Sequence, residues 1–261
     1  MVSFRDVGWV WEGQGLDPGV DPSVLGAGDG CRFFGLRRAN FMFHPNTDFA
    51  LDHLAWLDEV TCDISKWRYR DTPSGGTEHW VDAGLEAVTR EAALVSALSV
   101  EHPNVTGAFH DDMLGLVRRE GLTAEQYAQV YAAAQSHNAE LKLWAVVYMH
   151  ELEAPEWPQF APFMDVVTLW IWESQHLDQQ DEAIARCRRL FPNKPVLMGC
   201  YLRDYTLQAP VPMARVQQQW ESVARNLDAG ALQGYSILSA NLIDGHLEQA
   251  RWVRDFIVAQ S

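Results

Sequence analysis

The sequence lacks any run of about 18 apolar residues, which argues against a membrane-spanning helix. It is also short of positive charge, since 20 Lys and Arg face 35 Asp and Glu, for a formal net charge of −15. Nucleic acids and anionic membrane surfaces both require a basic face on their partner, so we expect neither to bind. The opening segment, Met1–Asp6, shows no basic stretch followed by an apolar one, and we expect a cytoplasmic protein.

Several motifs of cofactor and metal chemistry are missing as well. The four cysteines, at positions 31, 62, 187 and 200, form no CxxC pair, which predicts neither a disulfide framework nor a zinc knuckle. The segment Gly13–Gly15 is not followed by a third glycine where a dinucleotide-binding turn needs one. No GxSxG segment marks a nucleophilic serine. We therefore predict no cofactor.

Short apolar runs rich in β-branched and aromatic residues alternate with helical segments along the chain. Eight such runs are predicted to be strands, at 7–11, 39–43, 59–64, 105–110, 142–149, 165–172, 195–202 and 234–240. Eight strand–helix units in 261 residues predict an α/β fold, a single (β/α)8 TIM barrel that occupies residues 1–261 as one domain. An open, doubly wound sheet is the alternative.

The helices between these strands are predicted from apolar spacing and capping residues. Asp82 is the expected N-cap of the helix before the fourth strand, and Thr123 with Gln126 forms a capping box for the helix after it. Later helices are expected at 177–190, 212–227 and 246–258. The crossover after the first strand is rich in Gly, Asp and Pro, and only 22–27 is expected to be helical there.

Carboxylates lie where the active site of such a barrel is expected, at the C-terminal ends of the strands. Four are candidate catalytic groups: Asp111 and Asp112 after the fourth strand, Glu173 after the sixth and Asp204 after the seventh. A carboxyl group beside another carboxylate, shielded by Trp, has a raised pKa and can act as a general acid. Each has a structural alternative: Asp111 or Asp112 caps the next turn, Glu173 begins a helix, and Asp204 pairs with Arg203.

Tryptophan is in excess, with 11 residues, and several of these lie at the strand ends together with tyrosines. A sugar ring packs its C–H face on indole while its hydroxyl groups bind carboxylate, amide and imidazole; a phosphate would require Arg, Lys or a glycine loop. We therefore predict a small-molecule carbohydrate as ligand. The predicted substrate-binding residues are Trp11, Glu12, His44, Asp63, Lys66, Trp67, His110, Tyr148, Trp172, Tyr201 and Asn241. The alternative is that about half of the aromatic residues pack outward against the helices, although Trp170 and Trp172, two residues apart, should share one face.

Other chemistry at the same strand ends stays open. His44, His110 and His150, together with Asp63, are an alternative donor set for zinc or manganese. No HxH or HExxH spacing supports that set, so no metal is predicted. Lys66 is an alternative Schiff-base lysine, although such a lysine more often pairs with a carboxylate.

The acidic residues after the fourth, sixth and seventh strands, with the segments Gly199–Tyr205, Leu232–Leu238 and Trp252–Phe256, resemble those of glycoside-hydrolase-like barrel proteins of bacteria. The resemblance implies a carbohydrate-active hydrolase in which Asp111 or Asp112 works with Glu173 or Asp204. The DxxDxDxE signature of chitinase-like barrels is absent, as is the Asn-Glu pair of many retaining glycosidases. A metal-dependent hydrolase or isomerase and a non-catalytic sugar-binding barrel are the alternative functions, and no oligomeric state is predicted.

Overall fold

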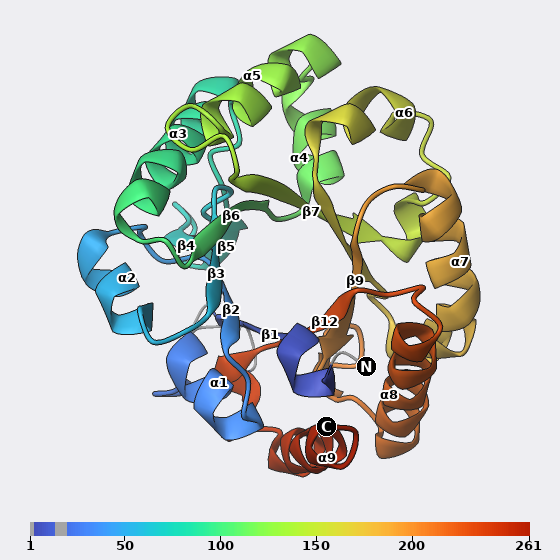
Figure 1. Ribbon diagram of the computed structural model, residues 1–261. Coiled ribbons are helices and arrows are strands. Elements are labelled where there is room, and N and C mark those ends of the chain that lie inside the picture. The colour runs from blue at the N-terminus through green and yellow to red at the C-terminus, as the bar shows by residue number, and fades with distance from the viewer. Residues whose placement is uncertain (1–2, 14–19) are drawn as a thin grey trace.

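Eight parallel strands close into a barrel in the computed structural model, which describes residues 3–13 and 20–261 (Figure 1). Around the barrel the strands follow their order along the chain, and they are β1 (Gly8–Trp11), β2 (Arg38–Phe41), β3 (Glu59–Asp63), β6 (Val105–His110), β7 (Lys142–Tyr148), β8 (Val166–Trp170), β9 (Val196–Tyr201) and β12 (Gly234–Leu238). Each predicted strand overlaps one of these, so the predicted TIM-barrel fold is confirmed. Gln14 and Gly15 of the glycine segment lie outside the described residues.

The strands are mostly apolar because the barrel buries both of their faces. Every residue of β8 and of β9 is buried, for example. Helices surround the barrel on its outside (Figure 1), and they are α1 (Ala27–Phe34), α2 (Asp48–Leu54), α3 (Leu85–Glu101), α4 (Met113–Glu120), α5 (Ala124–Ala134), α6 (Trp157–Phe160), α7 (Gln180–Leu190), α8 (Met213–Asp228) and α9 (Leu247–Ala259). Within the described residues, none of these helices is long and apolar enough to cross a bilayer.

Two short hairpins interrupt the strand–helix alternation, and the sequence analysis predicted neither. One pairs β4 (Arg68–Asp71) with β5 (Thr77–Trp80), and the other pairs β10 (Arg203–Asp204) with β11 (Ala209–Pro210). Both follow the C-terminal end of a barrel strand, β3 and β9 respectively. They therefore add side chains to the end of the barrel where the strands terminate.

Two predicted helix starts are wrong; a tertiary contact explains the first and a local turn explains the second. The crossover helix is α1, which begins at Ala27 rather than covering 22–27, because the Glu12 carboxylate accepts the Ala27 N–H at 2.7 Å. The helix α3 begins after Gly84, and Asp82 instead accepts the Gly84 N–H at 3.3 Å.

Elsewhere the helix predictions agree more closely with the structure. The capping box at Thr123 and Gln126 is confirmed, with hydrogen bonds of 2.9 and 3.2 Å. The helix expected from 177 begins as a 3-10 segment, Ser174–Gln179, and becomes α-helical at Gln180. The helices α8 and α9 lie within one residue of the predicted bounds.

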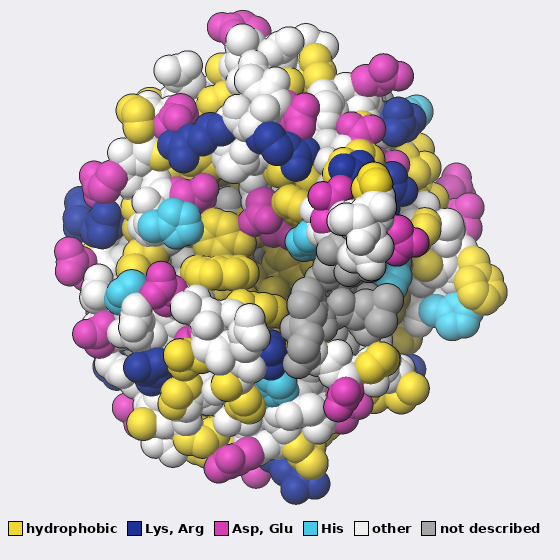
Figure 2. All heavy atoms as spheres, turned by 180° about the vertical axis from the view of Figure 1, so that it is seen from behind, with side chains coloured by type: hydrophobic (Ala, Val, Ile, Leu, Met, Phe, Trp, Pro, Cys, Tyr) yellow, Lys and Arg dark blue, Asp and Glu magenta, His cyan; other side chains and the backbone are white. Residues whose placement is uncertain are grey.

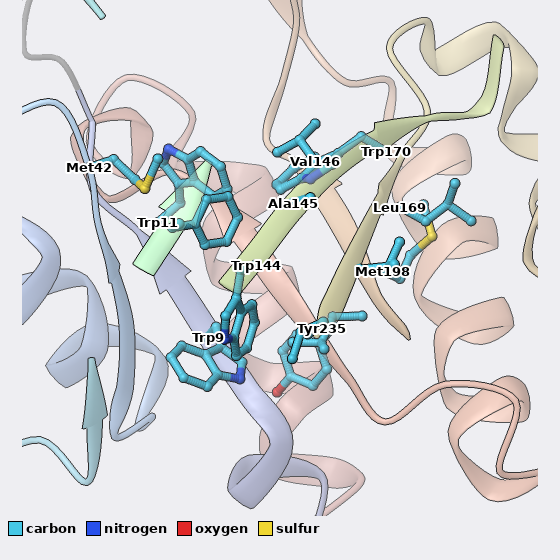
Figure 3. Close-up of a cluster of buried hydrophobic side chains, with 14 of the residues drawn as sticks. Trp9, Trp11, Met42, Trp144, Ala145, Val146, Leu169, Trp170, Met198 and Tyr235 are labelled. Atoms are coloured by element: carbon cyan, nitrogen blue, oxygen red, sulfur yellow. The ribbon is translucent and has the colours of Figure 1, made fainter. Parts of the chain in front are cut away.

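Indole rings fill the interior of the barrel at two levels (Figure 3). Trp9 of β1 packs edge-on against Trp144 of β7, with ring centroids 4.7 Å apart. Two residues further along β1, Trp11 packs in the same way against Trp170 of β8, at 5.2 Å. Gly199 of β9 makes room for this level, since a Cβ atom there would lie 2.0 Å from the Trp170 ring. The interior is therefore a packed core, as expected for this barrel type.

Candidate active site

The adjacent aspartates Asp111 and Asp112 both lie beyond the end of a strand. The strand β6 ends at His110, so the rule that neighbouring strand residues face opposite sides no longer applies to either aspartate. Asp112 has a φ of 49°, in the left-handed region, and this turn leads directly into α4. The hydroxyl of Ser65, at the end of β3, accepts the Asp111 N–H at 2.7 Å and donates to the Asp111 carbonyl at 3.2 Å. The turn is thereby fixed to the neighbouring strand.

The carboxyl groups of these two residues share an environment that favours the protonated form. Burial raises the pKa of Asp111 well above its ordinary value, and the charges of Asp112 and Asp63 raise it further. Burial also raises the pKa of Asp112, although a 2.7 Å hydrogen bond from the Tyr148 hydroxyl and the nearby His79 and His150 rings oppose this effect. We infer that Asp111 is the group that holds a proton most readily, and that Asp112 is the better carboxylate.

Aromatic side chains from β7, β8 and β9 form a wall beside Asp112. Trp172 is 41% exposed; it stacks on Tyr205 at 5.4 Å and meets Tyr148 and Tyr201 edge-on at 6.1 and 6.0 Å. A side-chain hydrogen bond links Tyr201 to Tyr148. Burial raises the pKa of both tyrosines, so both hydroxyl groups stay protonated and act as donors.

A cavity of about 420 Å³ opens at this wall, and this volume lies within the range of small-molecule sites. On its other side Trp67 stacks on His79 of the β4–β5 hairpin, with ring centroids 4.5 Å apart. The cavity is lined by Trp67, Asp112, Gly115, Leu116, Arg119, Tyr148, His150, Glu151 and Trp172. Figure 2 shows the same face of the barrel, with hydrophobic side chains on the floor of a central depression and acidic atoms at its edge.

Glu173 and Asp204 do not line this cavity. Glu173 is half-buried and accepts a hydrogen bond from Gln175 at 2.5 Å. Asp204 accepts the backbone N–H groups of Ser174 and Leu207 at 3.0 and 2.8 Å. Burial tends to raise the pKa of Asp204, but these hydrogen bonds hold it below its ordinary value. The contacts of Asp204 order the loops after β8 and β9, and among the described residues it forms no ion pair with Arg203.

Asp63 and Glu12, which were predicted to bind substrate, accept hydrogen bonds from backbone N–H groups instead. Asp63 is fully buried and accepts the N–H groups of Phe43, Ser65 and Lys66 at 2.9, 2.6 and 3.0 Å. Glu12 accepts the N–H of Gly13 at 3.0 Å in addition to that of Ala27. Burial raises the pKa of Glu12, and these hydrogen bonds counteract it. Both side chains shape the loops around the barrel mouth.

Four further predicted residues also have partners within the protein. His110 is buried and hydrogen-bonded to the Tyr127 hydroxyl at 2.9 Å, and burial lowers its pKa to about 3. Lys66 donates to the His44 carbonyl at 2.6 Å, and Asn241 bonds to Ser239. The fully buried Trp11 belongs to the barrel core. Of the predicted binding residues, the cavity therefore contains Trp67, Tyr148 and Trp172, with Tyr201 directly behind them.

The proposed metal donors are not brought together. Among the described residues, no three His, Cys, Asp or Glu side chains are placed to hold a metal ion, so the set of His44, His110, His150 and Asp63 is not a centre. Sequence reasoning missed the cavity residues Gly115, Leu116 and Arg119, which come from the short helix α4. It also missed His79 on the β4–β5 hairpin, because a hairpin outside the strand–helix alternation gives no periodic pattern.

Comparison with solved structures finds barrel glycoside hydrolases that have the same fold as this chain. A β-glucuronidase from Bacteroides uniformis superposes with a TM-score of 0.60 at 10% identity, over 91% of this chain and 30% of its own length. A GH99 endo-α-mannosidase from Bacteroides thetaiotaomicron gives 0.57 at 11% identity, over the full length of both chains. A GH18 chitinase catalytic domain from the fern Peteris ryukyuensis gives 0.56 at 12% identity, over 98% and 100%. The fold is shared.

The comparisons also limit what can be transferred. No protein-family model matches the sequence, and no curated protein matches it. The chain spans less than a third of the β-glucuronidase. The structural neighbours are glycoside hydrolases with a closed eight-stranded parallel barrel, as the sequence resemblance implied, and the catalytic groups must be assigned from this chain's own residues.

Proposed function

We propose that this protein hydrolyses glycosidic bonds in a carbohydrate and that Asp111 and Asp112 supply the two carboxyl groups. The observation that carries the proposal is a pair of adjacent carboxyl groups with raised pKa values, of which Asp112 lines an aromatic-walled cavity. Glycoside hydrolysis requires one carboxyl group that donates a proton and one that stays ionised. The names of the neighbours, a glucuronidase, a mannosidase and a chitinase, support the substrate class.

The environments of the two carboxyl groups assign their roles. Desolvation and the charges of Asp112 and Asp63 raise the pKa of Asp111, so we assign it as the general acid that protonates the departing oxygen. Asp112 is kept ionised more easily by the Tyr148 hydroxyl, so it stabilises positive charge on the sugar or activates the attacking water. One water molecule is consumed for each bond that is cleaved.

The cavity walls suit the other parts of a sugar. Trp67 and Trp172 offer indole faces on which the C–H face of a ring can pack. The side chains of Arg119 and His150 lie in the same lining and can bind hydroxyl groups. We also propose that the protein acts in the cytoplasm, and its four free, buried thiols support this because reducing compartments keep cysteines unpaired.

The test is an assay of wild-type protein and variants against α- and β-linked aryl glycosides and natural oligosaccharides. We expect Asp111→Asn and Asp112→Asn each to reduce kcat/KM by about 100-fold or more. Asp58→Asn is the matched control, because Asp58 is an exposed partner of Arg37 away from the cavity, and it should keep full activity. Circular dichroism confirms that each variant is folded.

Two further variants examine the remaining carboxylates. Glu173→Gln and Asp204→Asn should retain most activity, because neither residue lines the cavity or is adjacent in the chain to Asp112, which does. If either abolishes hydrolysis while Asp111→Asn and Asp112→Asn remain active, our assignment of the pair is wrong. Binding of sugars without any product after long incubation would instead identify a non-catalytic sugar-binding barrel.

A further inference from the structure

Arg203 is a buried arginine that has no acidic partner within residues 3–13 and 20–261. It lies in β10 with 4% of its surface exposed, and its Nε has no hydrogen-bond partner. Among the described residues it forms no ion pair, and the adjacent Asp204 is engaged with the backbone of Ser174 and Leu207. A buried charge without a counter-charge is costly, so its presence requires an explanation.

A second unpartnered polar side chain lies near it. His246 precedes the first residue of α9 and is 6% exposed. The Gly245 backbone is close to its ring, but neither ring nitrogen forms a hydrogen bond of good geometry. Burial lowers the pKa of His246, and the positive charge of Arg203 lowers it further. The two side chains are therefore close enough to interact electrostatically. Two separate elements thus bring unsatisfied hydrogen-bonding groups to one place.

This place is the end of the seventh and eighth barrel strands. The strand β10 follows β9 after one residue, and α9 follows β12 through a short 3-10 segment. A hydrogen bond of 3.0 Å from Leu202 N–H to the Leu238 carbonyl joins the two strand ends. TIM barrels frequently bind anionic groups at this position.

We propose that Arg203 and His246 bind the anionic substituent of an acidic sugar, a carboxylate or a phosphate. A guanidinium group presents N–H donors that match two oxygens of either anion, and imidazole adds a further donor. Tyr201, two residues before Arg203, packs on Trp172 of the aromatic wall, so the same segment of chain contributes to the wall and carries Arg203. The inference rests on the proposed carbohydrate ligand for the sugar ring, and on the unsatisfied Arg203 Nε and His246 ring nitrogens for the anion.

Binding of matched monosaccharides tests the subsite. Calorimetric titration of wild-type protein with glucose, glucuronate and glucose 6-phosphate should show one or both acids binding about tenfold or more tightly than glucose. The acid that gains more identifies the anion as carboxylate or phosphate. Acetate and inorganic phosphate, titrated alone, should bind much more weakly than the corresponding sugar acid. Equal affinity for glucose and both acids would overturn the proposal.

Variants assign the preference to these residues. Arg203→Met should abolish the preference for the acid, whereas Arg203→Lys and His246→Gln should reduce it. Arg251→Met removes the same charge from an exposed position on α9 and should leave the preference intact. A preference that survives Arg203→Met, or that Arg251→Met removes equally, would show that the subsite is not at Arg203.

Thermal unfolding provides an independent readout. Without ligand, Arg203→Met should melt at the same temperature as wild type or higher, because the substitution removes an uncompensated buried charge. A clearly lower melting temperature would make Arg203 a structural residue and overturn the proposal. None of these measurements depends on turnover. Acidic-sugar binding without hydrolysis would therefore refute the proposed reaction alone, and hydrolysis without a preference for acids would refute the subsite alone.

Discussion

Replacing Tyr148 by Phe removes one hydroxyl group and leaves the aromatic wall in place. That hydroxyl donates to Asp112 at 2.7 Å and is also hydrogen-bonded to Tyr201. A hydrogen bond to a charged group contributes about 1.5–3 kcal/mol. If Asp112 must be ionised for catalysis, Tyr148→Phe should lower kcat/KM at neutral pH by about 10- to 150-fold.

The pH profile distinguishes this role from a purely structural one. The Tyr148 hydroxyl favours the ionised form of Asp112 and so opposes the rise in pKa that burial causes. Without the hydroxyl the pKa of Asp112 rises further, and the acidic limb of the kcat/KM profile should move to higher pH. The carbon-13 resonance of the Asp112 carboxyl group should titrate with the same displacement.

A matched substitution controls for the loss of a hydroxyl group. Tyr131 also donates to a carboxylate, Asp165, at 3.0 Å, but neither residue lines the cavity. Tyr131→Phe should therefore leave the acidic limb where it is in wild type. An unchanged limb in Tyr148→Phe, or a limb displaced to lower pH, would refute the assignment of Asp112 as the ionised carboxylate.

Three further predictions concern stability and binding. Asp111→Asn should melt at a higher temperature than wild type at pH 7. The pKa of Asp111 is raised in the folded protein, so the wild type loses stability as this carboxyl group ionises with rising pH. The melting temperatures of the two proteins should converge below about pH 4, where the group is protonated in both the folded and the unfolded state. The pKa of His110 is lowered to about 3, so the folded wild-type protein loses stability as pH falls below 6.5. In denaturant titrations between pH 6.5 and pH 4, His110→Gln should lose about 3 kcal/mol less unfolding free energy than wild type. Trp170→Ala should cost about 3–5 kcal/mol of unfolding free energy because it empties the core, whereas Trp172→Ala should keep stability and raise the Kd for sugar about fivefold, or about 1 kcal/mol. Equal effects of the two Trp substitutions on stability would contradict the distinction.

The barrel could be predicted from sequence because its strands are buried on both faces. A segment such as Val166–Trp170 is buried at every position and apolar at all but Thr168, and eight mostly apolar segments alternating with helices fit one closed sheet in a chain of this length. The helix starts at Leu85 and Ala27 could not be predicted. One depends on an unexpected turn at Asp82 and the other on a carboxylate 15 residues away, at Glu12.

The candidate site was predictable only in part. Adjacent carboxylates after a strand are visible in the sequence, and the structure places Asp112 at the cavity with Tyr148 and Trp172. The same reasoning could not show that Asp63 is engaged by three backbone N–H groups, because their proximity is a tertiary property. Trp170 and Trp172 carry identical side chains two residues apart, yet only the second extends past the strand into solvent.

The edge-on indole pairs inside the barrel also have a spectroscopic consequence. Trp9 with Trp144, and Trp11 with Trp170, are fixed pairs at about 5 Å, a separation at which the electronic transitions of two indoles couple. Coupled transitions in a fixed chiral arrangement give a circular dichroism couplet in the far ultraviolet, where indole absorbs strongly, and this couplet vanishes when the barrel opens. Trp67 and Trp172 lie outside these pairs and report on ligands through fluorescence. One chromophore type thus provides two separable signals, one for closure of the barrel and one for occupation of its mouth.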